Sequence, residues 1–195
     1  MAATKKMDAV ALLKADHRKV EDLFKKFAKA KDSRTKQSLA KEICTELSVH
    51  ATIEEEIFYP ACNGKVDEDL QHESYVEHDG AKVLIAELEG SSPDNEFFDA
   101  KMTALCEQIK HHVKEEEKPA EGLFAQARQA GLDMDSLGEE LKARKQQRLT
   151  QIKEKGLPPP KTRSPTGPKR EQGDSVAQAG TREHLGTQRR CYENP

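Results

Sequence analysis

Apolar residues recur every three or four positions along most of the first 154 residues of the chain. This spacing places them on one face of an α-helix and predicts helical structure from residue 8 to residue 154. Turn-forming residues interrupt the pattern at Asp32-Ser33, Asn63-Gly64, Gly90 to Pro93 and Gly131. The breaks delimit helices at about 8–31, 34–62, 67–89, 93–118, 121–130 and 135–154.

The first four of these helices are long and are joined by short connections, which favours antiparallel neighbours. We therefore expect an all-α fold: an up-down four-helix bundle over residues 8–130, with a C-terminal helical extension over 131–154. Ser92 followed by Pro93 is typical of a helix start, because proline is tolerated where no backbone donor is needed. The fourth helix is therefore predicted to begin at Pro93.

The composition changes near Lys155, where proline, glycine and serine become frequent and apolar residues become rare. Such a segment cannot bury enough apolar surface to offset its ordering entropy, so residues 155–195 are predicted to form a disordered polar tail. The tail has eight basic and four acidic residues, which leaves a net charge of about −7 on residues 1–154. With one tyrosine as its only aromatic residue, it lacks the stacking groups of a single-strand nucleic-acid binder. We interpret it as a solvated tail.

The whole chain of 195 residues has a net charge of −3, which does not point to nucleic acid as a partner. No stretch approaches the roughly 20 apolar residues needed to span a bilayer, and the N-terminus does not resemble a secretory signal. The four cysteines form no CxxC pair and match no zinc or disulfide framework. We expect a cytoplasmic protein with reduced thiols and no membrane partner.

Each of the four long helices has one stripe of largely apolar residues that is interrupted by a histidine. In the second and fourth helices, a glutamate follows the histidine four residues later. The stripes are Val10, Leu13, His17, Val20, Phe24 and Phe27; Ile43, Leu47, His50, Glu54, Ile57 and Ala61; Gln71, Ser74, His78, Ala81, Ile85 and Leu88; and Phe98, Met102, Leu105, Ile109, His112 and Glu116.

A single histidine on an apolar stripe is more often a hydrogen-bonded core residue than a metal ligand, and a run of glutamates is usually a solvated helix face. Four stripes with the same interruption favour a different interpretation, because unpaired buried carboxylates cost several kcal/mol each. A cation between the helices would compensate them. The neighbouring glutamates lie off the stripes and are predicted to be solvated: Glu55, Glu56, Glu115 and Glu117.

Residues four apart on a helix lie about 5–6 Å apart on one face. His50 with Glu54, and His112 with Glu116, can therefore each offer a nitrogen and an oxygen to a common centre. Histidine and carboxylate ligands without thiolate disfavour structural zinc and suit iron or manganese, and six ligands suggest two metal ions.

Four sequence blocks in this order resemble the hemerythrin family, and specifically its bacterial HHE cation-binding domains. They are DHRKVEDLFKKF at 16–27, HATIEEEIFYP at 50–60, VEHDGAKVLIAEL at 76–88 and HHVKEEE at 111–117. The resemblance implies a four-helix bundle around a non-haem di-iron centre, oxo- or hydroxo-bridged, with manganese as the alternative metal. The implied ligands are His17, His50, Glu54, His78, His112 and Glu116, with the two glutamates bridging.

The sequence departs from the oxygen-carrying hemerythrins at Ser74, where the third helix of those proteins has a further histidine. Nearby Glu73 is the expected substitute ligand. His112 is preferred over His111 as a ligand, because His112 lies on the stripe four residues before Glu116.

The resemblance implies a protein that binds or senses dioxygen, peroxide or nitric oxide, or that handles iron, in a stress response. Two other functions stay open. One is a di-iron enzyme that acts on peroxide in the manner of a catalase, which is less favoured because the sequence offers no acid–base pair beyond the ligands. The other is an interaction module in which the metal is structural.

Overall fold

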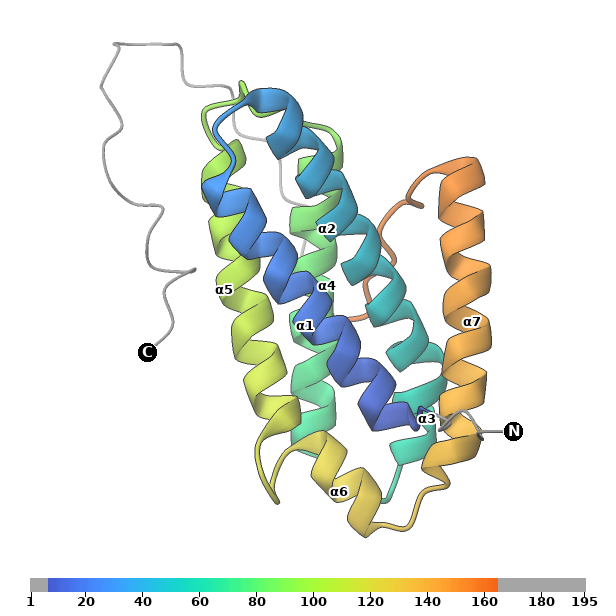
Figure 1. The fold of residues 1–195 in the computed structure, drawn as a ribbon. Coiled ribbons are helices and arrows are strands. Elements are labelled where there is room, and N and C mark those ends of the chain that lie inside the picture. The colour runs from blue at the N-terminus through green and yellow to red at the C-terminus, as the bar shows by residue number, and fades with distance from the viewer. Residues whose placement is uncertain (1–6, 165–195) are drawn as a thin grey trace.

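Four long antiparallel helices form the body of the molecule in the computed structural model, which describes residues 7–164. They are α1 (Ala9–Lys29), α2 (Ser33–Ile53), α4 (Glu68–Glu89) and α5 (Phe98–Glu117). Helix α1 packs on α2 and α5, and α4 packs on α2 and α5, so that the four enclose a common core (Figure 1). The expected all-α four-helix bundle is confirmed.

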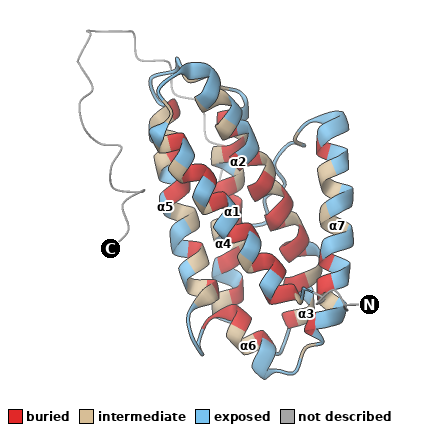
Figure 2. Cartoon of the chain, in the orientation of Figure 1, coloured by how far each residue is buried: buried red, intermediate tan, exposed pale blue. Residues whose placement is uncertain are grey.

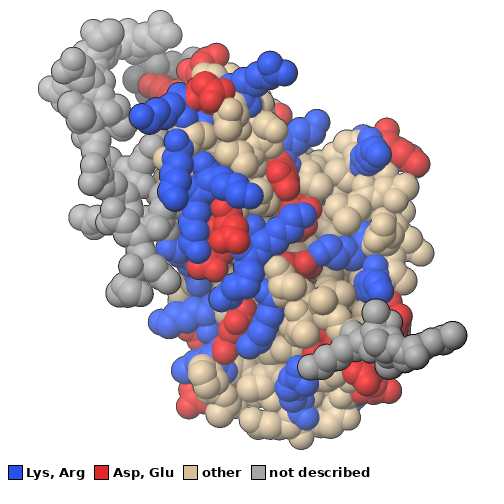
Figure 3. Space-filling view, viewed as in Figure 1, with Lys and Arg blue, Asp and Glu red and all other residues tan. Residues whose placement is uncertain are grey.

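Three further α-helices complete the described part of the chain: α3 (Tyr59–Cys62), α6 (Leu123–Gln129) and α7 (Met134–Lys155). Helix α6 crosses the end of the bundle where α1 begins and α5 ends, and α7 runs along the outside against α1 and α2 (Figure 1). Within residues 7–164 no helix is long and apolar enough to span a membrane. Figure 3 shows Lys, Arg, Asp and Glu side chains interspersed over one face of the molecule.

An aspartate side chain begins each of four helices by accepting a hydrogen bond from a backbone N–H three residues further on. This satisfies one of the N–H groups that have no partner within the helix. The four capping residues are Asp8, Asp32, Asp67 and Asp133. The local sequence thus fixes where α1, α2, α4 and α7 begin.

Helix α5 begins at Phe98, so the start predicted at Pro93 is wrong. The intervening residues form turns, in which the Asn95 backbone N–H donates to the Ser92 carbonyl at 2.9 Å. The Asn95 side chain then accepts from the Phe97 N–H at 3.0 Å. Asparagine side chains stabilise such turns in competition with helix, and here the turn delays the helix by five residues.

The expected single helix at 34–62 is interrupted by a π-helical segment, η1 (Glu54–Phe58), in which the chain is wound more widely. Pro60 follows it, and proline both lacks a backbone donor and clashes with the carbonyl four residues earlier. The extra residue in the turn shifts the inward face by one position. Phe58 and Tyr59 are therefore fully buried, whereas Ile57, which the stripe predicted to face inward, is only partly buried.

The apolar core is divided into two clusters along the bundle axis. One cluster contains Phe24, Leu47 and Met102, and the other contains Leu13 and Phe58. Figure 2 shows the buried residues on the inner faces of the bundle helices, whereas α7 is largely exposed. Along the bundle helices, the histidines and glutamates of the stripes lie between residues of one cluster and residues of the other. They form a buried layer with apolar residues on both sides, which we call the polar layer: His17, His50, Glu54, His78, His112 and Glu116.

The segment after α7, residues 156–164, turns back against the bundle, and we call it the strap (Figure 1). The backbone N–H groups of Arg163 and Ser164 donate to Asp79 Oδ2 at 2.7 and 2.6 Å. The Lys161 carbonyl accepts from Lys82 Nζ at 3.1 Å. The first part of the predicted disordered tail is thus placed against α4; the rest of that prediction, residues 165–195, lies outside the described residues.

Candidate metal centre

The polar layer brings together all six residues that the sequence singled out as metal ligands. His17 comes from α1, His50 from α2, His78 from α4, and His112 from α5. The two glutamates are fully buried and the four histidines are at most 5% exposed: His17, His50, Glu54, His78, His112 and Glu116. The burial of the histidine stripes is therefore confirmed.

One group of side chains is formed by His17, His50, Glu54 and Glu116, whose ligand atoms lie within 4.8 Å of one another. The two imidazole Nε2 atoms are 2.9 Å apart. Glu54 Oε2 lies 3.1 Å from His50 Nε2, and Glu116 Oε2 lies 3.4 Å from His17 Nε2. All four side chains therefore converge on one point.

A second group is formed by Glu54, His78 and His112. The two Nε2 atoms are 3.2 Å apart, and Glu54 Oε2 lies 3.4 Å from His78 Nε2. Glu116 Oε2 also reaches this group, at 3.5 Å from His112 Nε2. Both carboxylates are thus shared between two pairs of histidines, the arrangement expected of a site for two cations.

Each of the four imidazoles has a second carboxylate behind it, at its Nδ1 atom. The distances are 2.7 Å from His17 to Glu117, 3.7 Å from His50 to Asp16, 3.1 Å from His78 to Glu55 and 2.8 Å from His112 to Glu77. In the three shorter contacts the carboxylate holds the proton on Nδ1 and turns the Nε2 lone pair toward a metal ion. Asp16 is too far from His50 Nδ1 for a hydrogen bond, and this nitrogen has no hydrogen-bond partner among the described residues.

The prediction that Glu55 and Glu117 are solvated is wrong, because both carboxylates contact histidines of the buried cluster. Glu55 is 8% exposed and also accepts from Lys82 Nζ at 2.6 Å. The side chain of Glu117 is 18% exposed and also accepts from Arg18 at 2.8 Å. Glu56 is exposed as predicted and pairs with Arg144. The widened η1 turn explains the burial of Glu55, because it turns two consecutive glutamates, Glu54 and Glu55, toward the interior.

The carboxylates also set the protonation of the metal-free cluster. Burial opposes the charged imidazole, but Glu54 and Asp16 outweigh it and raise the pKa of His50 to about 10. Burial opposes the charge of His78 as well, and Glu54 and Glu55 raise its pKa to about 9. Burial would raise the pKa of Glu54, but His50 and His78 hold that pKa well below its usual range. The carboxylates are thus compensated by positive charge on the histidines.

Two carboxylate oxygens of the cluster have no hydrogen-bond donor among the described residues: Glu54 Oε1 and Glu116 Oε2. A buried oxygen without a donor is costly in a folded protein. Both atoms belong to the carboxylates that the two histidine groups share, and metal ions coordinated by those groups would satisfy them. The donor set, four imidazole nitrogens and two carboxylates without thiolate, fits iron or manganese.

Tyr59 lies at the same level and was missed by the sequence analysis. Its hydroxyl donates to Glu116 Oε1 at 2.9 Å and lies 3.4 Å from both Glu54 Oε2 and His78 Nε2. The ring stacks on His78 with centroids 5.5 Å apart. The sequence signal was Pro60, which marks the widened turn that brings Tyr59 onto the inner face.

Glu73, the expected substitute ligand beside Ser74, is exposed and does not belong to the buried cluster. It lies instead in an outer group with Glu77 and His111. The Ser74 hydroxyl donates to the Leu70 carbonyl at 3.0 Å. Within residues 7–164 no carboxylate therefore replaces the missing histidine, and the Tyr59 hydroxyl is the added polar group at this level.

Comparison with known proteins gives one family. A model described as the hemerythrin HHE cation binding domain matches residues 8–124. A DNA nickase of Nostoc sp. (strain PCC 7120 / SAG 25.82 / UTEX 2576) is 30% identical over 122 residues, which are 63% of this chain and 34% of that protein. The chain therefore spans about a third of the length of this curated relative.

A solved structure from Mycobacterium kansasii has a similar fold. It is described as a hemerythrin HHE cation binding domain-containing protein, a homologue of Rv2633c. The TM-score is 0.62 at 21% sequence identity, and the match covers 77% of this chain and 94% of the other. This likeness supports the fold.

Proposed function

Because this chain belongs to the hemerythrin HHE cation-binding family, we propose that its polar layer holds two iron ions. We further propose that the protein binds or senses dioxygen, peroxide or nitric oxide there, in the cytoplasm. The observation that carries the proposal is the sharing of Glu54 and Glu116 between two histidine pairs. Manganese is the alternative metal for the same donor set.

Each part of the cluster has a role in this proposal. The four Nε2 atoms and the two shared carboxylates hold the ions, and the Nδ1 carboxylates fix the tautomers of His17, His78 and His112. Phe58 and Phe124 belong to the apolar cluster that contains Leu13, and they exclude water from that side of the polar layer. Bound iron would supply an open coordination position and reversible redox chemistry. Tyr59 keeps its hydroxyl proton, because burial and the neighbouring carboxylates raise its pKa well above the usual range.

Anaerobic titration of the metal-free protein with ferrous iron tests this proposal. We expect saturation at two ions per chain, followed on exposure to air by an absorption band in the near ultraviolet or blue. His112→Ala should lower the stoichiometry or the affinity, whereas Glu56→Gln, at an exposed position two residues after Glu54, should leave both unchanged. Saturation at one ion, or no stoichiometric binding, would overturn it.

A second candidate function is peroxide disproportionation, and the position of Tyr59 favours it. Its hydroxyl, which donates a hydrogen bond to Glu116 at 2.9 Å, places a polar O–H group beside the proposed ions that the sequence alone did not offer. The test is oxygen evolution from hydrogen peroxide by the iron-loaded protein. Catalytic turnover that falls in Tyr59→Phe at unchanged iron content would favour the enzyme; a single stoichiometric spectral change would favour binding or sensing.

DNA nicking is the activity named for the Nostoc relative, about two thirds of which has no counterpart in this chain. The geometry here disfavours that activity for the polar layer. Its six residues are at most 5% exposed, so a DNA backbone has little access to them. We expect supercoiled plasmid to stay intact with the metal-loaded protein, as judged by gel electrophoresis.

A further inference from the structure

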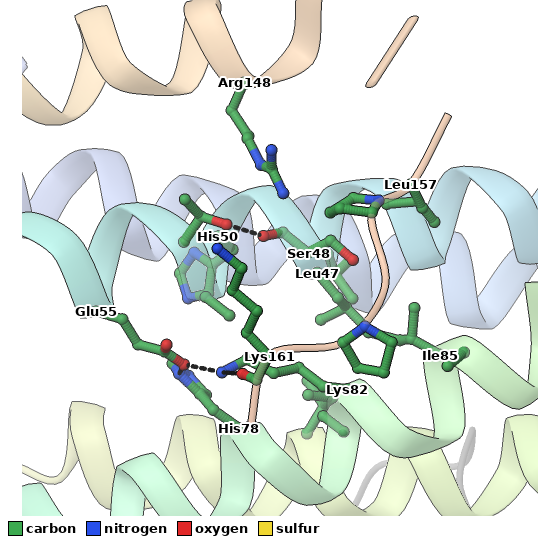
Figure 4. A pocket seen from close by; sticks show the side chains of 18 of the residues that line it. Leu47, Ser48, His50, Glu55, His78, Lys82, Ile85, Arg148, Leu157 and Lys161 are labelled. Carbon is green, nitrogen blue, oxygen red and sulfur yellow. Dashed lines mark hydrogen bonds and ion pairs between the residues drawn. The ribbon is translucent and has the colours of Figure 1, made fainter. Parts of the chain in front are cut away.

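A cavity of about 380 Å³ lies beside the polar layer, between α2, α4, α7 and the strap (Figure 4). This volume is within the range of small-molecule binding sites and near its lower end. All four histidines of the polar layer line its inner side: His17, His50, His78 and His112. The cavity therefore reaches the histidines of the polar layer, whereas Glu54 and Glu116 do not line it.

Apolar side chains form much of the cavity wall. Leu47 contributes from α2, Ile85 from α4 and Leu157 from the strap, together with the prolines at 158–160. Proline restricts the backbone, and the hydrogen bonds from the strap to Asp79 hold its end in place. The cavity is thus bounded by a stiff outer wall and accommodates the hydrocarbon part of a ligand.

Most charged groups at the cavity rim are already paired. Glu55 accepts from Lys82 at 2.6 Å and has Arg163 at 3.8 Å. Glu56 accepts from Arg144 at 2.6 and 3.1 Å. These carboxylates and cations compensate one another and leave little net charge for a ligand.

Asp16 pairs with Lys145 in the same way. Glu89 is exposed near the C-terminal end of α4 and forms no ion pair within residues 7–164. It stands eleven residues after His78, roughly 16 Å along the helix at 1.5 Å per residue, and so lies away from the layer.

Arg148 and Lys161 are the exceptions among the cations that line the cavity. Neither has a carboxylate within ion-pair distance in the described structure. Among residues 7–164, Arg148 donates only to Gln151, at 3.3 Å, and its Nε is buried without a hydrogen-bond partner. Figure 4 shows Arg148 extending from α7 and Lys161 extending from the strap into the same opening.

We propose that this cavity binds a small amphipathic carboxylate, with its alkyl part against Leu47, Ile85 and Leu157 and its carboxylate between Arg148 and Lys161. A guanidinium with an unused buried donor is suited to a carboxylate, which it binds through charge-assisted hydrogen bonds. The apolar wall excludes water from the rest of the ligand. The proposed contacts are with Arg148, Lys161 and the apolar wall and not with the histidines of the polar layer, so carboxylate binding does not require iron.

Calorimetric titration of the full chain with octanoate tests the proposal, in the metal-free and in the iron-loaded protein. We expect one saturable site for octanoate with a dissociation constant below about 1 mM. Acetate lacks the alkyl chain and 1-octanol lacks the charge, so both should bind at least about tenfold more weakly. Arg148→Met should weaken octanoate about tenfold or more and leave 1-octanol unchanged.

Lys153→Met is the matched control, because it removes an exposed cation from the same helix at a position that does not line the cavity. It should leave octanoate binding unchanged. The proposal is overturned if 1-octanol binds as tightly as octanoate, if Arg148→Met and Lys161→Met retain full affinity, or if octanoate does not saturate. Iron stoichiometry measured on the same samples separates this outcome from failure of the metal proposal.

Discussion

The Tyr59 hydroxyl lies 2.9 Å from Glu116 Oε1 and 3.4 Å from Glu54 Oε2. It therefore contacts both carboxylates that connect the two histidine pairs. A single side chain, from the end of the widened η1 turn, thus links the second and fourth helices of the bundle at the level of the polar layer.

Tyr59→Phe removes this hydroxyl while keeping the ring that stacks on His78. In the metal-free protein the change leaves Glu116 with one donor fewer, so the free energy of unfolding should fall by about 1–3 kcal/mol. Denaturant unfolding measures it. Tyr75→Phe is the control, because it removes a hydroxyl from the ring packed against Tyr59 and should cost less; an equal loss in both variants would contradict the special role of Tyr59.

Glu117→Gln tests the carboxylate behind His17, 2.7 Å from its Nδ1. The variant loses the charge that fixes the imidazole, and metal affinity should fall about 10- to 100-fold, as is typical for such partners of ligand histidines. Competition with a chelator measures the affinity. Glu115→Gln is the control, because Glu115 belongs to the same run of glutamates but does not contact His17; this variant should bind metal as tightly as the parent protein. Parent-like metal affinity in Glu117→Gln would contradict the prediction.

The stability of the metal-free protein should decrease with rising pH. The pKa values of His50 and His78 are raised to about 10 and 9 in the folded state, from about 6.5 in the unfolded chain. Their contribution is complete below pH 6.5 and is lost as the pH rises through 9 to 10. Urea unfolding between pH 6.5 and pH 10 measures it.

The affinity of the protein for metal should show the opposite trend and increase with pH between pH 6.5 and pH 10. The ions need neutral imidazoles, so binding displaces the protons of His50 and His78 and becomes stronger as the pH rises. Calorimetry in buffers of different ionisation enthalpy counts the released protons. Metal uptake without proton release would contradict the protonation assigned to the metal-free cluster.

Gly138→Ala should loosen the docking of α7. A Cβ at this position would lie 2.6 Å from the Met7 carbonyl oxygen and 2.9 Å from the Ala9 nitrogen, both backbone atoms. At an open position in a helix, Gly→Ala would stabilise the folded protein by up to about 1 kcal/mol. At Gly138 we expect instead that the free energy of unfolding falls by about 1–3 kcal/mol, because the Cβ would overlap backbone atoms. Unchanged or higher stability would place α7 further from the start of α1.

The helical stripes of α1 and α4 were predicted correctly, and that of α5 also, except that Ile109 is only partly buried. Such a pattern is a property of one regular helix. His17, His78 and His112 could be found from spacing alone, and His50 with Glu54 from the regular part of the second helix. The prediction was wrong beyond Glu54, where the chain leaves regular α-helical geometry. Residues after that point, Ile57 and Tyr59 among them, take positions that no constant spacing predicts.

The sequence by itself determined the all-α class, the capped starts of four helices and the six polar interruptions of the stripes, because these depend on local hydrogen bonding and on helical periodicity. The tertiary structure decided which carboxylates stand behind the histidines, since Glu77 and Glu117 meet their imidazoles across different helices. It also decided the position of the strap, whose anchor on Asp79 joins residues 84 and 85 positions apart. Contacts over such separations depend on how whole helices pack, and no local pattern encodes them.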